Sequence, residues 1–181
     1  MRTMVNLLTG FLQGDGVSQS SRCLGELKNV FDNEPARAEM DQQTIVYDVQ
    51  SHMVVPEGTP GGLFFGTSNV MPGQVDGEYF MTKGHFHTRK ECAEYYWCIE
   101  GTGALILMDE EGRCWFEEMT PGSLHYIPGF VAHRLANTGD VPLRVGACWP
   151  CDAGHDYATI AESGFTARLK DVNGVPTLVE G

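Results

Sequence analysis

The sequence has few basic residues and no long hydrophobic run. Its 12 lysine and arginine residues are outnumbered by 24 aspartate and glutamate residues, which gives a formal net charge of −12. An acidic chain is a poor partner for nucleic acid or for an anionic membrane surface. No segment approaches the ~18 apolar residues of a membrane-spanning helix, and polar residues interrupt the apolar patch in 1–12, unlike in a cleavable leader. We therefore expect a cytoplasmic protein that binds neither nucleic acid nor a membrane.

Paired cysteine motifs are equally scarce. Of the six cysteines, only Cys148 and Cys151 have Cys-x-x-Cys spacing, within C-W-P-C. A redox or zinc site there would need a helix start or a second pair, and neither is evident. We expect the cysteines to be reduced, as is usual in a cytosolic protein.

Between residues 44 and 149 the sequence contains no amphipathic helical pattern. Short β-prone segments alternate instead with turns rich in glycine, proline and aspartate, a spacing typical of an antiparallel sandwich or barrel. Beyond them, residues 156–162 predict a short helix, and Asn173-Gly174 predicts a two-residue hairpin turn. The fold class is therefore all-β, with predicted strands at 44–49, 63–70, 78–87, 94–99, 103–108, 113–117, 124–127, 131–137 and 142–149.

The N-terminal part of the chain has the weakest pattern. Within it, residues 21–31 predict at most a turn or two of helix, and Pro35 is expected to end any helix before it. We interpret residues 1–43 as an N-terminal extension that packs on the barrel or on a partner subunit. Residues 44–181 then form the barrel domain.

Histidine and glutamate residues from two segments form a candidate metal site. His85 and His87 are two residues apart, so on an extended strand both imidazoles point to the same face. Glu91 and Glu94 follow shortly after, and His133 lies in a second segment, P-G-F-V-A-H. A lone His-x-His pair is more often a surface feature, but two histidines with a carboxylate and a distant histidine suit a divalent metal. Residue type alone does not choose between the two glutamates.

The first of these segments resembles the first cupin motif. That motif joins His-x-His to a downstream glutamate and then a glycine. Glu91 has the more usual spacing from His87, but only Glu94 is followed by six residues and then a glycine, Gly101. The count to the glycine therefore favours Glu94.

The second segment resembles the second cupin motif. Cupins have a glycine, a proline, a histidine and an asparagine at fixed intervals, and the matching residues are Gly122, Pro128, His133 and Asn137. Gly129 follows the proline directly rather than one residue later, which affects the turn and not the ligand. The resemblance implies a cupin fold, a double-stranded β-helix or jelly-roll-like barrel.

Within the cupins, the chain resembles the cupin-type glucose-6-phosphate isomerases of archaea and some bacteria. The resemblance covers roughly residues 44–165, and its last block lies outside general cupin patterning. In that family the glutamate is displaced from the usual cupin position, which again favours Glu94 over Glu91. The matching blocks are G-T-S-x-x-x-P-G at 66–73, E-Y-F-M-T-K-G-H-F-H at 78–87, E-Y-Y at 94–96 and D-A-G-H-D-Y-A-T-I-A-E-x-G-F at 152–165.

The resemblance implies a homodimer that interconverts D-glucose 6-phosphate and D-fructose 6-phosphate, in glycolysis and gluconeogenesis. Each subunit would hold one divalent metal, with Fe²⁺ favoured by the resemblance and Mn²⁺, Ni²⁺, Co²⁺ or Zn²⁺ also suited to the ligands. Proton transfer between C1 and C2 through an enediol-type intermediate needs a base and stabilisation of a developing negative oxygen. The implied metal ligands are His85, His87, Glu94 and His133.

The resemblance also implies roles for residues around the metal. Glu94 is expected to act as the proton-transferring base as well as a ligand. Tyr96 shares its strand parity, so it can face the same cavity and donate to a substrate oxygen or shuttle protons. The residues expected to bind the substrate are Ser68, Thr82, Gly84, His155 and Tyr157.

Some of these positions carry a condition or a departure from the family. Strand parity places Thr82 and His85 on opposite faces, so both reach one cavity only if a β-bulge at Gly84 resets the alternation. Ser68 stands where the family usually has threonine, and it keeps the hydroxyl. Trp149 stands where tyrosine is common, and we assign it no polar role.

Two other function classes fit the same ligand set. A non-haem Fe(II) dioxygenase of the cupin family uses three histidines and a glutamate with O₂ at an open position, and would take up oxygen without converting hexose phosphate. A non-catalytic sugar-phosphate-binding cupin would need the binding residues but not Glu94. The blocks at 78–87 and 152–165 favour the isomerase.

Overall fold

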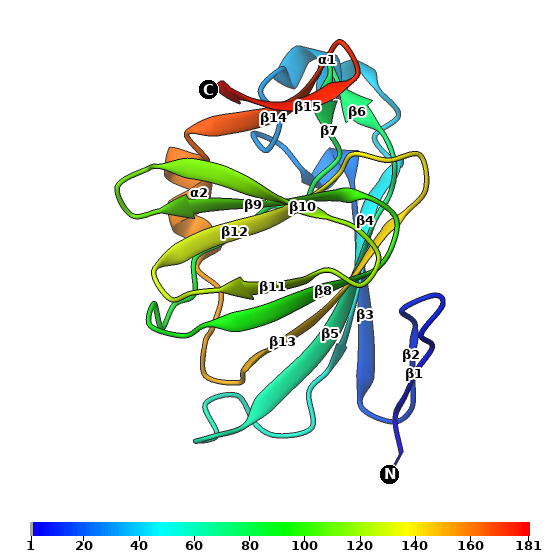
Figure 1. Cartoon of the computed structure of the whole chain (residues 1–181), viewed down its shortest axis with the longest axis vertical. Helices are drawn as coiled ribbons and strands as arrows, with labels where there is room; N and C mark the ends of the chain where they lie inside the picture. The colour runs from blue at the N-terminus through cyan, green and yellow to red at the C-terminus, as the bar shows by residue number, and fades with distance from the viewer. Residues whose placement is uncertain (1) are drawn as a thin grey trace.

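The computed structural model describes residues 2–181, which fold mainly into β-strands arranged as two facing layers (Figure 1). One layer is a six-stranded antiparallel sheet in the order β11 (Leu124–Ile127), β8 (Glu94–Glu100), β13 (Leu143–Pro150), β5 (Leu63–Val70), β4 (Ile45–His52) and β3 (Val17–Cys23). The other is a three-stranded sheet of β10 (Cys114–Met119), β9 (Gly103–Asp109) and β12 (Val131–Asn137). Glu94 and His133 meet across the interior between the layers. The predicted all-β cupin fold is confirmed.

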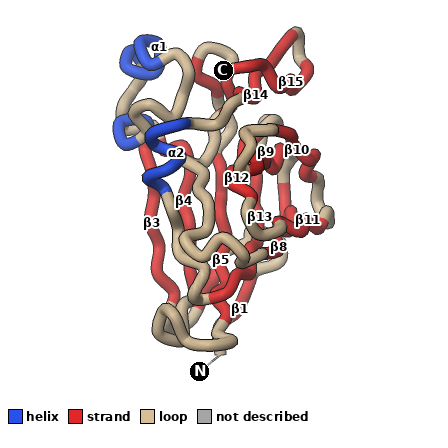
Figure 2. Tube along the Cα trace, turned by 90° about the vertical axis from the view of Figure 1, so that its left-hand side faces the viewer, coloured by secondary structure: helices blue, strands red, loops and turns tan. Residues whose placement is uncertain are grey.

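Smaller elements cover the ends of the two layers. Figures 1 and 2 show the C-terminal hairpin and α1 at the same end of the molecule, away from the N-terminus. No helix among residues 2–181 is long and apolar enough to cross a membrane. The remaining strands are β15 (Val175–Glu180), β14 (Ala167–Val172), β7 (Glu78–Tyr79) and β6 (Gln74–Val75) in a third sheet, and β1 (Met4–Val5) with β2 (Leu12–Gln13) in a two-stranded sheet. The helices are η1 (Leu24–Glu26, 3₁₀), α1 (Glu34–Glu39) and α2 (Tyr157–Ser163).

Apart from β3, the strands that carry the layers lie close to their predicted bounds, because alternation and turn residues mark both ends of each. β9 and β12 are buried along their whole length. Each fully buried leucine there, such as Leu105 or Leu107, contributes about 1.5–3 kcal/mol relative to an exposed one. His133 therefore sits on a strand that is buried along its whole length.

The predicted strand at 78–87 is interrupted, and as one continuous strand the prediction is wrong. β7 covers only Glu78–Tyr79, and the chain then pairs with β12 through isolated bridges, Met81 with Ala136 and His85 with His133. The step from Met81 to His85 is one residue longer than the step from Ala136 to His133. The extra residue is a β-bulge at Gly84, whose φ of 77° lies in the left-handed region that glycine favours.

Replacing Gly84 with alanine is expected to destabilise the protein by about 2–4 kcal/mol. The left-handed backbone disfavours any Cβ by roughly 1–2 kcal/mol. The added Cβ would also lie 2.8 Å from Cε2 of Phe165 and 3.0 Å from Cβ of Arg134. Urea unfolding of the metal-free protein measures the change. Gly122→Ala is the control, because Gly122 has a φ of 91° but no atom within 4 Å of its Cβ position; equal losses in both variants would refute the steric part.

The N-terminal residues join the main sheet. The expected helix within 21–31 is limited to the 3₁₀ turn η1, and the chain before it forms β3, which pairs with β4 at the edge of the six-stranded sheet. Pro35 does not end a helix but lies in the first turn of α1, where its missing N–H is not needed. The side chain of Asn33 caps α1 by accepting a hydrogen bond from the backbone N–H of Ala36 at 3.0 Å.

The C-terminal elements follow the sequence pattern. The predicted helix at 156–162 is confirmed as α2, which Asp156 caps through the backbone N–H of Thr159. The hairpin at Asn173-Gly174 is also confirmed and connects β14 to β15. Both turn residues have positive φ, 56° and 81°, as a type I′ turn requires.

Candidate active site

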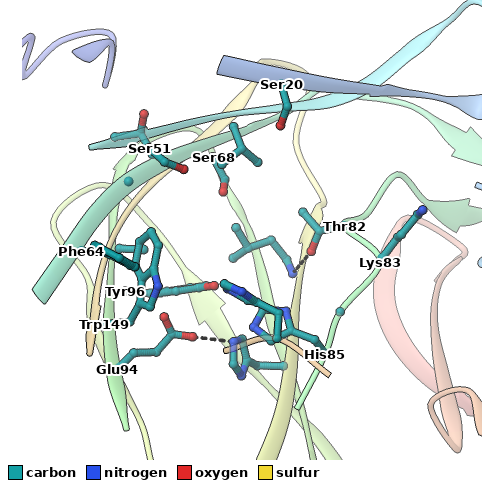
Figure 3. A pocket seen from close by; sticks show the side chains of 18 of the residues that line it. Ser20, Ser51, Phe64, Ser68, Thr82, Lys83, His85, Glu94, Tyr96 and Trp149 are labelled. Atoms are coloured by element: carbon teal, nitrogen blue, oxygen red, sulfur yellow. Dashed lines mark hydrogen bonds and ion pairs between the residues drawn. The ribbon is translucent and has the colours of Figure 1, made fainter. Parts of the chain in front are cut away.

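Four side chains converge inside the barrel, and Figure 3 labels two of them, His85 and Glu94. They are His85 and His87 from the bulged segment, Glu94 at the first position of β8, and His133 in β12. Each offers one ligand atom, and these atoms all lie within 4.8 Å of one another. Oε1 of Glu94 lies 2.5 Å from Nε2 of His133 and 3.5 Å from Nε2 of His87. The structure thus brings together the four residues expected as ligands.

Backbone carbonyls orient two of the imidazoles. Nδ1 of His87 lies 2.9 Å from the carbonyl oxygen of Cys92, and Nδ1 of His133 lies 3.3 Å from that of Val131. A carbonyl oxygen can only accept, so Nδ1 donates to it and Nε2 faces the cluster, where the neutral ring offers a lone pair to a metal. Such a hydrogen bond fixes the ring of a metal-binding histidine.

The atoms at the centre of the cluster have no hydrogen-bond partner. Within residues 2–181, Nε2 of all three histidines and Oε1 of Glu94 are buried and make no hydrogen bond of acceptable geometry, despite their close approach. Buried lone pairs that face one another in this way are costly. A divalent cation removes that cost, and imidazole with carboxylate is a ligand set that Fe, Mn, Ni, Co and Zn accept. The residues present therefore fit a divalent metal.

Burial and proximity control the protonation of these groups. Burial, with the neighbouring histidines, lowers the pKa of His85 well below its ordinary value. Burial alone would raise the pKa of Glu94, but His133 and His87 outweigh it and hold that pKa at about 2. Burial would lower the pKa of His87, but the Glu94 carboxylate outweighs this and the pKa is raised. Glu94 is thus ionised at neutral pH, the state that metal binding requires.

The cluster borders a cavity of about 300 Å³. The Gly84 bulge brings Thr82 and His85 to this one cavity, which meets the condition set by strand parity. Figure 3 shows the hydroxyls of Ser68 and Thr82 on the side of the cavity away from Glu94. All five residues expected to bind substrate line the cavity: Ser68, Thr82, Gly84, His155 and Tyr157. Their roles in binding stay predictions.

Aromatic side chains surround the imidazoles. The ring of Tyr96 lies edge-on to His133 at a centroid distance of 5.7 Å. Burial, with the charge of Glu94, raises the pKa of Tyr96 well above its ordinary value, so the phenol stays protonated. The ring of His155 lies 4.5 Å from that of His85 and stacks on Tyr157 at 5.8 Å. Burial lowers the pKa of His155, so this imidazole is neutral at pH 7.

Glu91, the competing glutamate, does not line the cavity. Its side chain is 60% exposed and pairs with Arg89 at 3.3 Å. Arg89 also pairs with Asp152. The geometry therefore favours Glu94 over Glu91, and Arg89 belongs to a solvated ion-pair network.

Sequence reasoning missed several residues that line the cavity. Arg22 of β3 and Tyr47 of β4 contribute to it, and so does Lys83. Trp149 lines it too, and packs edge-on against Phe64 at 6.0 Å. Recognising residues 17–23 as a strand would have indicated Arg22, since alternate residues of a strand share one face.

Comparison with known proteins identifies similar sequences along most of the chain. A family model described as "Glucose-6-phosphate isomerase (GPI)" matches residues 21–176. A protein named glucose-6-phosphate isomerase from Thermococcus litoralis is 40% identical over 168 residues, which cover 92% of this chain and 86% of that one. A protein of the same name from Sinorhizobium medicae is 32% identical over 171 residues, covering 92% of this chain and 78% of that one.

Solved structures of oxalate decarboxylase are also similar in part. A deletion mutant of the Bacillus subtilis protein superposes with a TM-score of 0.48 at 18% identity, over 66% of this chain and 30% of that one. Another, solved at pH 4.6, superposes with a TM-score of 0.47 at 19% identity, over 60% of this chain and 26% of that one. The chain thus spans less than a third of the length of these structures.

Proposed function

The chain belongs to the glucose-6-phosphate isomerase family, and we propose that it interconverts D-glucose 6-phosphate and D-fructose 6-phosphate in the cavity beside its histidine–glutamate cluster. The observation that carries this proposal is the buried cluster itself, four ligand atoms within 4.8 Å at the wall of a 300 Å³ cavity. A hexose phosphate placed there would lie between the cluster and the hydroxyls at the other side.

We propose that His85, His87, Glu94 and His133 hold one divalent metal per subunit. When bound there, the ion supplies Lewis-acid stabilisation of the oxygen that becomes negative during enolisation. The identity of the ion is a finer part of the proposal, with Fe²⁺ preferred on the family resemblance. Mn²⁺, Ni²⁺, Co²⁺ and Zn²⁺ are the alternatives that the ligand set accepts.

Glu94 is the proposed base that moves the proton between C1 and C2. Its low pKa keeps the carboxylate ionised and available, although it also makes the group a weak base. The protonated phenol of Tyr96 compensates, because it is buried beside Glu94 and can donate to a substrate oxygen as charge develops. Tyr96 is therefore the proposed partner acid.

The opposite side of the cavity is the proposed phosphate end. Ser68 and Tyr157 offer hydroxyl donors, and Gly84 offers a backbone N–H without a side chain to obstruct it. Oγ1 of Thr82 already accepts a hydrogen bond from the backbone N–H of Leu135 at 3.0 Å, which leaves its own hydrogen free to donate. His155, neutral and beside His85, is proposed to contact the sugar hydroxyls.

A coupled assay tests the proposed function. Metal-free protein is reconstituted separately with Fe, Mn, Ni, Co and Zn, and glucose 6-phosphate formed from fructose 6-phosphate is followed by NADPH absorbance. Turnover with at least one metal is expected, and its absence with all five would contradict the proposal. Oxygen consumption by the iron form without hexose phosphate conversion would instead identify a dioxygenase.

We further propose that the protein is a cytoplasmic homodimer and that the N-terminal hairpin contributes to the subunit contact. Leu7 and Leu8, between β1 and β2, are 80% and 81% exposed. Such side chains are candidates for burial against a second copy, one of the two possibilities expected for residues 1–43, which were to pack on the barrel or on a partner subunit.

Replacing Leu7 and Leu8 together with aspartate is expected to weaken self-association by at least about 100-fold. The substitution removes two apolar contacts, each worth ~2 kcal/mol when it lies at the centre of an interface. It also places two charges in the contact. Sedimentation equilibrium measures the dissociation constant. Leu124→Asp is the matched control, because Leu124 is exposed on β11 but lies outside the hairpin. A monomeric wild type, or an unchanged dimer in the double variant, would rule out this contact.

A further inference from the structure

A second cavity, lined by cationic side chains, lies beside the active-site cavity. Its volume is about 180 Å³, and it shares Lys83, Gly84 and Tyr157 with the first cavity. The loop after η1, α2, β12 and β14 contribute its other walls. The basic residues that line it are Lys28, Lys83, Arg134 and Arg168. This concentration of positive charge is unusual in a chain with a net charge of −12.

Two donor atoms of the buried Arg134 guanidinium have no acceptor among residues 2–181. Arg134 is 3% exposed, and the ring of Phe165 covers one face of its guanidinium with the centroid 4.2 Å from Cζ. Considering residues 2–181, neither Nε nor Nη2 has a hydrogen-bond partner. Stacking on an aromatic ring uses the face of the group and leaves the in-plane N–H donors free. Buried charged donors without an acceptor are costly, so this position calls for an anion.

Arg168 adds a second guanidinium to the same cavity. Its Nη1 donates to the carbonyl oxygen of Val30 at 2.6 Å, whereas its Nε is unpaired within residues 2–181. Nη1 also lies 3.5 Å from Oε1 of Glu78, whose Oε2 accepts a hydrogen bond from the backbone N–H of Asp32. Glu78 therefore neutralises part of the charge, and the four cations retain an excess.

We propose that this cavity is a second anion site that binds a phosphate dianion, either free or as the end group of a small phosphomonoester. The planar donor forks of Arg134 and Arg168 suit the oxygens of a phosphate, and Lys28 and Lys83 add point charges. Figure 3 shows that the Lys83 side chain extends away from Glu94, so its charge does not serve the metal cluster. The cavity volume of about 180 Å³ is several times the ~30 Å³ that a water molecule occupies, which is enough for a phosphate group.

Calorimetric titration of the full-length, metal-loaded protein tests this site without any reference to turnover. Inorganic phosphate is one probe and glycerol 1-phosphate is the other. Arg168→Gln is expected to weaken binding by at least about tenfold and Lys28→Gln by about threefold. Arg113→Gln, at an arginine that lines neither cavity, and Ser68→Ala, in the active-site cavity, are expected to leave this binding unchanged. Because Lys28 is exposed, Lys28→Gln keeps the test decisive even if Arg168→Gln fails to fold.

The outcomes distinguish the second site from the active site. Tighter binding of the ester assigns the site to phosphomonoesters, and tighter or equal binding of inorganic phosphate assigns it to the free ion. Loss of binding in Ser68→Ala, with less than a twofold change in both Arg168→Gln and Lys28→Gln, would show that the active site alone binds phosphate and would overturn the proposal. Absence of any binding to the wild type would overturn it as well. Neither result depends on whether the protein isomerises hexose phosphates.

Discussion

Replacing Glu94 with glutamine is expected to reduce kcat by about 10³-fold or more in a protein that stays folded. Loss of a general base alone typically costs 10²–10⁴-fold. The change also removes the anionic ligand, whose Oε1 lies 2.5 Å and 3.5 Å from two imidazole nitrogens. Glutamine has nearly the same volume as glutamate, so the packing around it is conserved. Turnover of fructose 6-phosphate and the metal content per chain are measured on the same sample.

The metal content separates the two roles of Glu94. A variant with one metal per chain and no turnover would assign the loss to the base, and a metal-free variant would assign it to ligation. Glu91→Gln is the matched control, because an exposed ion pair such as Glu91–Arg89 is worth only ~0–1 kcal/mol. Its activity is expected within twofold of wild type. Loss of turnover in Glu91→Gln with normal turnover in Glu94→Gln would mean that the wrong glutamate was chosen.

The layers of the barrel were predictable because their strands are short, β-prone and bounded by turn residues. Outside the layers, the hairpin at Asn173-Gly174 was predictable in the same way, since that pair favours a turn with two positive φ values between two strands. The convergence of the cluster was also accessible, because His-x-His parity and motif spacing bring distant residues to one face. The choice of glutamate was less certain, because the spacing from His87 favours Glu91 whereas the count to Gly101 favours Glu94. The structure has Glu94 in the cluster.

The segment before the histidines was harder to predict because its strand character changes within a few residues. The sequence pattern of residues 78–87 predicts a continuous strand. The extra residue at Gly84 instead interrupts the pairing and shifts its register by one residue, so the side chains that follow change faces. A glycine within a strand pattern signals a bulge only weakly. The functional demand that Thr82 and His85 share a cavity was the better indicator.

The N-terminal strand was missed for a different physical reason. β3 has polar residues on both faces, because one face is turned to solvent and the other contributes Ser20 and Arg22 to the cavity. Residues 18–22 are all polar, so they give no alternation of apolar and polar residues to detect. A strand that forms a polar cavity wall therefore has the same sequence pattern as a surface loop. Only the pairing with β4 identifies residues 17–23 as a strand.

Removal of the metal is expected to abolish turnover and to lower the melting temperature by about 8–16 °C relative to protein with saturating metal. A ligand that binds only the folded state at 1,000 times its Kd stabilises that state by about 4 kcal/mol. For a chain of 181 residues, 1 kcal/mol shifts the melting temperature by about 2–4 °C. The four donor atoms make no hydrogen bond of acceptable geometry within residues 2–181, so the metal-free state retains their mutual repulsion. Chelation followed by calorimetric melting, and activity after metal is restored, measure both effects.

Two histidine variants make this prediction specific to the cluster. His133→Gln is expected to lose the metal-dependent shift and turnover together, because its Nε2 is the nitrogen nearest to the Glu94 carboxylate. His125→Gln is the matched control, since His125 is also buried but pairs with Glu117 and Ser123 outside the cluster. It is expected to melt at a lower temperature while keeping the full metal-dependent shift. A shift that survives in His133→Gln would mean that the stabilising ion binds elsewhere, and the ligand assignment would then fail even if the isomerase activity were real.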